Sequence, residues 1–274
     1  MKIEINGITV NIILQSFKIP QNKTPIIFLH GFTGSASDWE FTMQNINNDY
    51  FPIAIDLPGH GDTETSDNIE DYTSATINKI ILTVIEKLQV PKVVLLGYSM
   101  GGRAALSFAV QHSSKIKALI LESSTAGIEN SDEREVRLLS DMKLAEMIEK
   151  DGVEEFIKYW MELPLFESLK SVPIAEYQNI IQRKLSNKIK GLANSLRGLS
   201  TGKMKSLWDE LNKLNFPVLL ITGSTDNKYK LIASKMTSLL PQSEHKIVTD
   251  AGHNVHLEKP KEFIKLVNNF LEKL

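Results

Sequence analysis

Short, almost continuous apolar runs that alternate with helix-period segments constrain the fold of this chain more than any other feature. Such a run is typical of a strand that helices cover on both faces, and alternation with helices predicts parallel βαβ units. We therefore predict an α/β fold with a doubly wound, mostly parallel sheet. The predicted strands are 25–29, 52–55, 93–96, 118–121, 218–221 and 246–248, and the predicted helices are 72–88, 101–111, 229–239 and 261–274.

The N-terminal segment has a different pattern. Residues 1–14 alternate apolar and polar side chains around Asn6-Gly7, a pair that is typical of a two-residue hairpin turn. We therefore expect antiparallel strands at the start of the sheet.

The alternation of strands and helices is interrupted once. No strand-like run occurs in residues 126–208, whereas 132–162 and 174–199 are rich in helix-forming residues. This segment leaves the sheet after Leu121-Glu122, at the carboxyl end of a strand, where α/β proteins bind ligands. We predict a core of residues 1–125 and 209–274 and a helical lid of residues 126–208. A helical bundle on the far side of the sheet is the alternative.

Composition excludes several classes of protein. The 274 residues include 31 Lys and Arg against 33 Asp and Glu, so the basic excess of a typical nucleic-acid binder is missing. The chain has no cysteine, which excludes thiolate nucleophiles and disulfides. Polar residues interrupt the apolar runs near the N-terminus, so we expect no signal peptide, and no run reaches the roughly 18 apolar residues of a membrane span. We expect a cytoplasmic protein without a membrane or nucleic-acid partner, a monomer or a weak homo-oligomer.

A serine lies at a predicted strand-to-helix turn. Residues 97–101 read G-Y-S-M-G, between the predicted strand 93–96 and the predicted helix 101–111. A sharp turn there would expose the Ser99 hydroxyl, and side chains at positions 97 and 101 would collide with the neighbouring backbone. The helix N-terminus behind Ser99 favours negative charge, and the Met100 N–H would point at a reacting oxygen.

Three further residues follow predicted strands. Phe32 lies in the loop 30–35 (HGFTGS), Asp226 follows strand 218–221, and His253 follows strand 246–248. The order Ser, Asp, His is that of the α/β-hydrolase triad, in which the histidine removes the serine proton and the acid orients the imidazole. The Phe32 N–H would be the second oxyanion donor beside Met100. Taken singly, each could be an ordinary polar loop residue, and Asp250 is the rival acid.

On these motifs the chain resembles the α/β-hydrolase superfamily along nearly its whole length. Within it, the chain resembles the 2-succinyl-6-hydroxy-2,4-cyclohexadiene-1-carboxylate synthase family of menaquinone biosynthesis. The loop 30–35 is close to that family's H-G-F-L-G-S, with Thr33 in place of Leu, and residues 97–103 match its extended serine turn including Arg103. Residues 160–166 resemble a W-x-x-x-P-x-F element of its lid.

The resemblance implies a carbon–oxygen lyase. That family eliminates pyruvate from 2-succinyl-5-enolpyruvyl-6-hydroxy-3-cyclohexene-1-carboxylate. Ser99, deprotonated by His253, would act as a general base, and the Phe32 and Met100 N–H groups would hold the enolate oxygen. A carboxylesterase or a carbon–carbon bond hydrolase is the alternative, because the triad fits both. A non-catalytic small-molecule receptor is a third interpretation, against which the intact triad argues.

The substrate of that family carries three carboxylates, and residues 177–208 contain seven basic residues and no acidic one. A cationic lid face would attract such an anion, and arginine suits carboxylates through its planar fork. We predict Arg103, Arg137 and Arg183 as clamps, with Tyr98, Trp160 and Lys228 lining the pocket. No metal is expected because the histidines lack ligand spacing, and no nucleotide cofactor is expected.

Overall fold

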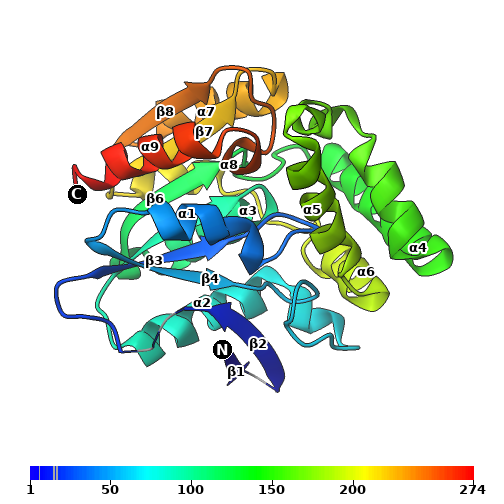
Figure 1. Ribbon diagram of the computed structural model, residues 1–274, viewed down its shortest axis with the longest axis horizontal. Coiled ribbons are helices and arrows are strands. Elements are labelled where there is room, and N and C mark those ends of the chain that lie inside the picture. Colours follow the sequence, from blue (N-terminus) through cyan, green and yellow to red (C-terminus); the bar gives the residue numbers. More distant parts are fainter. Residues whose placement is uncertain (6, 15, 17) are drawn as a thin grey trace.

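The computed structural model describes residues 1–5, 7–14, 16 and 18–274 (Figure 1). Within these residues the chain forms an eight-stranded sheet with the strand order β1-β2-β4-β3-β5-β6-β7-β8. The pairs β1–β2 and β2–β4 are antiparallel and the others are parallel, which confirms the predicted sheet. The strands are β1 (Lys2–Ile5), β2 (Ile8–Ile13), β3 (Thr24–Leu29), β4 (Tyr50–Ile55), β5 (Val93–Tyr98), β6 (Ile116–Glu122), β7 (Val218–Gly223) and β8 (Ser243–Val248).

The N-terminal hairpin is present as predicted. Strands β1 and β2 pair antiparallel, with Ile5 opposite Ile8, and Gly7 has a φ of 80° that favours glycine. Asn6, the other residue of the predicted turn, lies outside the described residues.

Helices cover both faces of the sheet. Helices α2, α3 and α7 share one apolar cluster with the sheet, whereas α8 and α9 share the other. This division is that of a doubly wound fold. The helices outside the insertion are α1 (Glu40–Asn45), α2 (Ser74–Leu88), α3 (Met100–Gln111), α7 (Asn227–Leu239), α8 (Val255–Glu258) and α9 (Pro260–Leu271).

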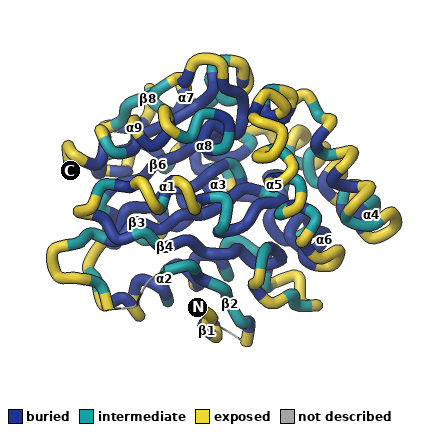
Figure 2. Tube along the Cα trace, viewed as in Figure 1, coloured by how far each residue is buried: buried dark blue, intermediate teal, exposed yellow. Residues whose placement is uncertain are grey.

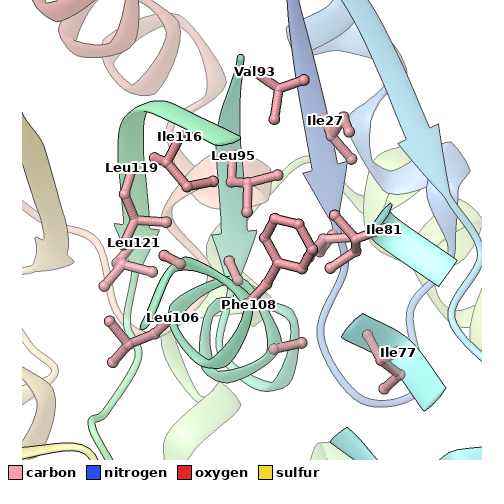
Figure 3. Packing of buried hydrophobic residues seen from close by; sticks show 14 of the residues in the cluster. Ile27, Ile77, Ile81, Val93, Leu95, Leu106, Phe108, Ile116, Leu119 and Leu121 are labelled. Carbon is pink, nitrogen blue, oxygen red and sulfur yellow. The ribbon is translucent and has the colours of Figure 1, made fainter. Parts of the chain in front are cut away.

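Burial on both faces explains the continuous apolar runs. Successive side chains of a strand point to opposite faces. In β5, Val93 and Leu95 therefore join the α2–α3 face, and Val94 and Leu96 join the α9 face. Figure 2 shows the central strands as buried along their length. Figure 3 shows Phe108 of α3 packed among the side chains of the α2–α3 face.

The segment between β6 and β7 is helical, as predicted. It contains α4 (Ser131–Met161), α5 (Ile174–Leu185) and α6 (Ile189–Gly198), which lie beside the sheet rather than on it (Figure 1). These helices bury an apolar cluster of their own that includes Phe156, Leu169 and Leu192. Residues 174–199, described above as rich in helix-forming residues, contain two helices, α5 and α6, with a break between them. The limits 126 and 208 for a separate lid stay a prediction.

No helix in the described part of the chain has the length and hydropathy needed to cross a bilayer.

Candidate active site

Ser99 lies at the sharp turn between β5 and α3. Its φ of 49° and ψ of −106° are strained for a residue other than glycine. A Cβ atom at Gly97 would lie 2.4 Å from the Gly101 carbonyl oxygen, and one at Gly101 would lie 2.2 Å from the Leu29 carbonyl oxygen. The predicted steric need for glycine on both sides of the serine is therefore confirmed.

The structure brings Ser99, His253 and Asp226 together. His253 Nε2 lies 3.0 Å from Ser99 Oγ, and His253 Nδ1 lies 2.7 Å from Asp226 Oδ2. Asp226 also accepts the Tyr229 N–H at 3.2 Å, so its carboxylate caps α7 while it faces the imidazole. The rival acid Asp250 is exposed and makes no contact of this kind among the described residues.

Two buried carboxylates hold the loop that carries His253. Glu258 accepts the N–H groups of Gly252 at 2.7 Å and Asn254 at 3.1 Å, one on each side of the histidine. Glu122 accepts the His256 backbone N–H at 3.0 Å and its ring Nδ1–H at 2.8 Å. Sequence reasoning missed both acids, since only the tertiary structure brings Glu122 to this loop.

A cavity of about 150 Å³ lies against the serine. Phe32 and Met100, the predicted oxyanion donors, line it together with Ser99. Met100 is the first residue of α3, so its N–H has no acceptor within the helix. No residue that the structure describes accepts a hydrogen bond from the Phe32 N–H. Both N–H groups are therefore available to an oxygen bound beside Ser99.

Two of the three predicted arginine clamps line this cavity. Arg103 donates to the Leu199 carbonyl oxygen at 2.9 Å and has no carboxylate partner within the described residues. Burial lowers the pKa of Arg103 to about 10, with the nearby Arg137 adding to the effect, so the guanidinium stays charged at neutral pH. Arg137 pairs with the buried Asp141 at 2.8 Å. Both side chains can offer N–H donors to an anion.

The third predicted clamp lies elsewhere. Arg183 lines a separate cavity of about 220 Å³, and its Nε pairs with Asp38 at 2.9 Å. Tyr98 is buried beneath the loop of Phe32, with its ring 5.3 Å from that of His253, and does not line the Ser99 cavity. The structure therefore does not bring Arg183 and Tyr98 to the place where they were expected.

The basic segment 177–208 does not form a cationic face over the serine. Arg197 pairs with Glu149, and Lys190 pairs with Asp67. None of the seven basic residues lines the Ser99 cavity, and three of them, Arg183, Lys190 and Arg197, pair with carboxylates from other parts of the chain. Positive charge at the cavity comes instead from Arg103, Arg137 and Lys228.

Trp160 and Tyr229 complete the cavity wall. Trp160, a predicted residue, has a buried Nε1–H without an acceptor among the described residues. Tyr229 was not predicted: its ring lies 4.5 Å from that of His253, and burial raises its pKa. Its place in the first turn of α7, three residues after Asp226, is the signal that could have identified it.

A larger cavity of about 900 Å³ adjoins the first. The two cavities share Arg137, Thr201, Lys228 and Tyr229, which form the wall between them. The larger one is lined mainly by residues of α4 and α7, so it lies between these two helices on the other side of that wall. No cluster of three potential metal-binding side chains occurs in the described part of the chain.

The sequence profile of the alpha/beta hydrolase fold family matches residues 24–260. A putative 2-succinyl-6-hydroxy-2,4-cyclohexadiene-1-carboxylate synthase from Bacillus subtilis is 40% identical over 92% of both chains. The chain belongs to this synthase family. The structure of MenH from S. aureus superimposes with a TM-score of 0.90 at 32% identity, covering 96% of this chain and 98% of that one. The Klebsiella pneumoniae synthase is 28% identical over 90% of this chain and 93% of its own.

Proposed function

We propose that this protein is a pyruvate-eliminating lyase that forms 2-succinyl-6-hydroxy-2,4-cyclohexadiene-1-carboxylate from its 5-enolpyruvyl precursor, in menaquinone biosynthesis. Membership of the synthase family supports this function. One structural observation carries it: a serine hydrogen-bonded to a buried histidine shares a cavity with Arg103, whose guanidinium has no carboxylate partner among the residues that the structure describes. A charged group in such a place is expected to meet an anion of the ligand.

The reaction begins with a proton transfer. Ser99 gives its hydroxyl proton to His253 Nε2, and Asp226 stabilises the resulting imidazolium. The Ser99 oxygen then removes the proton from the ring carbon next to the succinyl ketone. The electron pair moves through the ring double bond and breaks the carbon–oxygen bond at position 5. The 3-ene becomes the 2,4-diene, and the expelled enolpyruvate takes up a proton to give pyruvate.

The cavity supports the negative charge that develops in this step. The Phe32 and Met100 N–H groups hold the enolate oxygen, and each such donor typically lowers the barrier by about 3 kcal/mol. Arg103 and Arg137 bind substrate carboxylates, and Trp160 Nε1–H and Lys228 offer further donors from the wall. The paired Asp141 holds Arg137 in place while leaving its terminal nitrogens open to a ligand.

Direct measurement of pyruvate tests the proposal. The protein is incubated with the 5-enolpyruvyl substrate, and released pyruvate is coupled to lactate dehydrogenase. We expect turnover that falls by at least about 1,000-fold in Ser99→Ala, since removal of the serine from such a triad costs several orders of magnitude. Circular dichroism shows whether the variant keeps its fold. Absence of pyruvate, together with rapid hydrolysis of simple esters, would establish an esterase instead.

A further inference from the structure

The loop that carries Phe32 is held by the helical insertion. Three polar side chains at the carboxyl end of α5 contact the loop 30–35 or the turn that follows it: Arg183, Lys184 and Asn187. We call these three residues the α5 anchor. They lie about 150 residues away from the loop in sequence, so the contact depends on how the insertion packs on the core.

The loop needs such support because its backbone is strained. Thr33 has a φ of 65°, a conformation that costs a β-branched residue on the order of 1–3 kcal/mol. Thr33 directly follows Phe32, so a change in its backbone would move the proposed oxyanion donor. Within the loop, Gly34 N–H donates to the Gly31 carbonyl oxygen at 3.1 Å.

Two members of the α5 anchor bind Thr33 itself. Lys184 Nζ donates to Thr33 Oγ1 at 3.2 Å, and Asn187 Nδ2 donates to the Thr33 carbonyl oxygen at 2.9 Å. Both side chains are buried, and Asn187 also accepts the Gly61 N–H at 3.2 Å. The amide of Asn187 thus joins two loops of the core and fixes the orientation of the Thr33 carbonyl.

The third member acts through Asp38. Arg183 Nε donates to Asp38 Oδ1 at 2.9 Å, and the other oxygen of Asp38 accepts the Ser35 N–H at 3.2 Å. A Cβ atom at Gly34 would lie 2.4 Å from this carboxylate, so Asp38 packs directly on the loop. Lys184 and Arg183 hold the pKa of Asp38 below its usual value, although burial opposes them, which keeps the carboxylate ionised.

We propose that Arg183, Lys184 and Asn187 are positioning residues that hold the loop 30–35 so that the Phe32 N–H faces the oxygen bound at Ser99. This inference rests on the proposed function, because it concerns the same oxyanion site. None of the three lines the Ser99 cavity, so their effect on the reaction passes through the loop rather than through contact with the substrate. The role of Arg183 is thereby that of a loop anchor, not a carboxylate clamp.

The test separates positioning from substrate binding. Arg183→Met and Asn187→Ala are compared with wild type by steady-state pyruvate release and by amide hydrogen exchange of the peptide that spans residues 30–36. We expect kcat to fall about 10- to 100-fold, since a 1 Å misplacement can cost about 100-fold. We expect KM to change by less than about twofold. Exchange in the loop should become about fivefold faster, as for the loss of one hydrogen bond.

Matched controls come from the same insertion. Asn194 donates its amide to the Ser66 carbonyl oxygen and Arg197 pairs with Glu149, both away from the loop. Asn194→Ala and Arg197→Met should leave kcat and loop exchange within about twofold of wild type. If Asn187→Ala does not fold, Arg183→Met decides, because it removes one partly exposed ion pair.

Two results would overturn the proposal: unchanged kcat and loop exchange in Arg183→Met, or a rise in KM alone, which is the signature of a carboxylate clamp. Failure of the proposed function gives a different pattern. A wild type that releases no pyruvate refutes the lyase, whereas faster exchange of the loop in the variants still supports its anchoring by α5.

Discussion

At the scale of single residues, the surroundings of each arginine decide what it does. Arg103 and Arg183 are both partly buried. Arg103 faces the cavity of Ser99 and has no carboxylate partner in the described part of the chain, whereas Arg183 is neutralised by Asp38. An unpaired guanidinium costs desolvation energy that an anionic ligand would offset. The residue type and its position in the sequence were therefore not sufficient to distinguish an arginine that binds the substrate from one that anchors a loop.

Substitution of Arg103 tests this distinction. We expect Arg103→Met to raise KM for the enolpyruvyl substrate about 10- to 100-fold, because a charge-assisted bond contributes roughly 1.5–3 kcal/mol. Hydrolysis of p-nitrophenyl acetate, which carries no carboxylate, should change far less. Parallel steady-state assays with both compounds measure the ratio. An equal loss with both would favour a generic esterase.

Gly101 is a second residue whose neighbours decide its role. Gly101→Ala places a methyl group 2.2 Å from the Leu29 carbonyl oxygen, and since backbone must move, we expect the free energy of unfolding to fall by at least about 3 kcal/mol. Urea denaturation measures the loss. The matched change Gly152→Ala meets nothing within 4 Å but has a φ of 83°, so it should cost only about 1 kcal/mol. Equal losses would contradict the steric argument.

At the scale of elements, the site exists because parallel strands end at one edge of the sheet. The loops after β3, β5, β7 and β8 carry Phe32, Ser99, Asp226 and His253, respectively. Hydrogen bonds between adjacent strands bring these four loops together, although they span more than 200 residues of sequence. The His253 loop in turn depends on the buried carboxylate at the end of α8.

Glu258→Gln tests that dependence. A glutamine side chain has one acceptor oxygen where the carboxylate has two, so either the Gly252 or the Asn254 N–H loses its partner. We expect the free energy of unfolding to fall by about 1–3 kcal/mol, the cost of one unsatisfied buried group. Chemical denaturation gives this value. The control is Glu262→Gln on the exposed face of α9, and a similar loss there would contradict the assignment.

At the scale of the whole molecule, the core buries histidines that the chain must keep neutral. His30, the first residue of the Phe32 loop, and His60 are buried side by side, with ring centroids 5.0 Å apart. Burial holds the pKa of both below the usual 6.5, and for His60 the neighbouring His30 adds to the effect. Protonation of either ring would place a charge in the desolvated interior, and for His30 the nearby Asp56 and Asp38 offset this cost only in part.

Acidification should therefore destabilise the fold. Below pH 6.5 the unfolded chain binds protons that the native state does not, so the free energy of unfolding decreases as the pH is lowered. The decrease is up to about 1.4 kcal/mol per pH unit for each histidine. Urea unfolding between about pH 7.5 and 5.5 measures the slope. His60→Asn should show a shallower slope than wild type. Identical slopes would contradict the role of this pair.

Local sequence patterns were sufficient to predict the fold and the residues of the triad. Apolar periodicity depends on near neighbours in sequence. The glycines at 97 and 101 indicate a sharp turn, because only a few nearby backbone atoms decide whether a side chain fits there. The strand positions and the order of Ser99, Asp226 and His253 could therefore be read from the amino-acid sequence. The break between α5 and α6 was not visible in the same way, because both helices carry similar residues.

Only the tertiary structure decided which charges face the cavity. A long arginine or lysine side chain can reach many partners, and its pairing depends on carboxylates that lie far away in sequence, as Asp38 does from Arg183. The same holds for Glu122 and the His253 loop. Backbone conformation is set locally, whereas the pairing of buried charges is a property of the packed molecule. Sequence patterns therefore determined where the reaction can occur, and packing determined which side chains serve it.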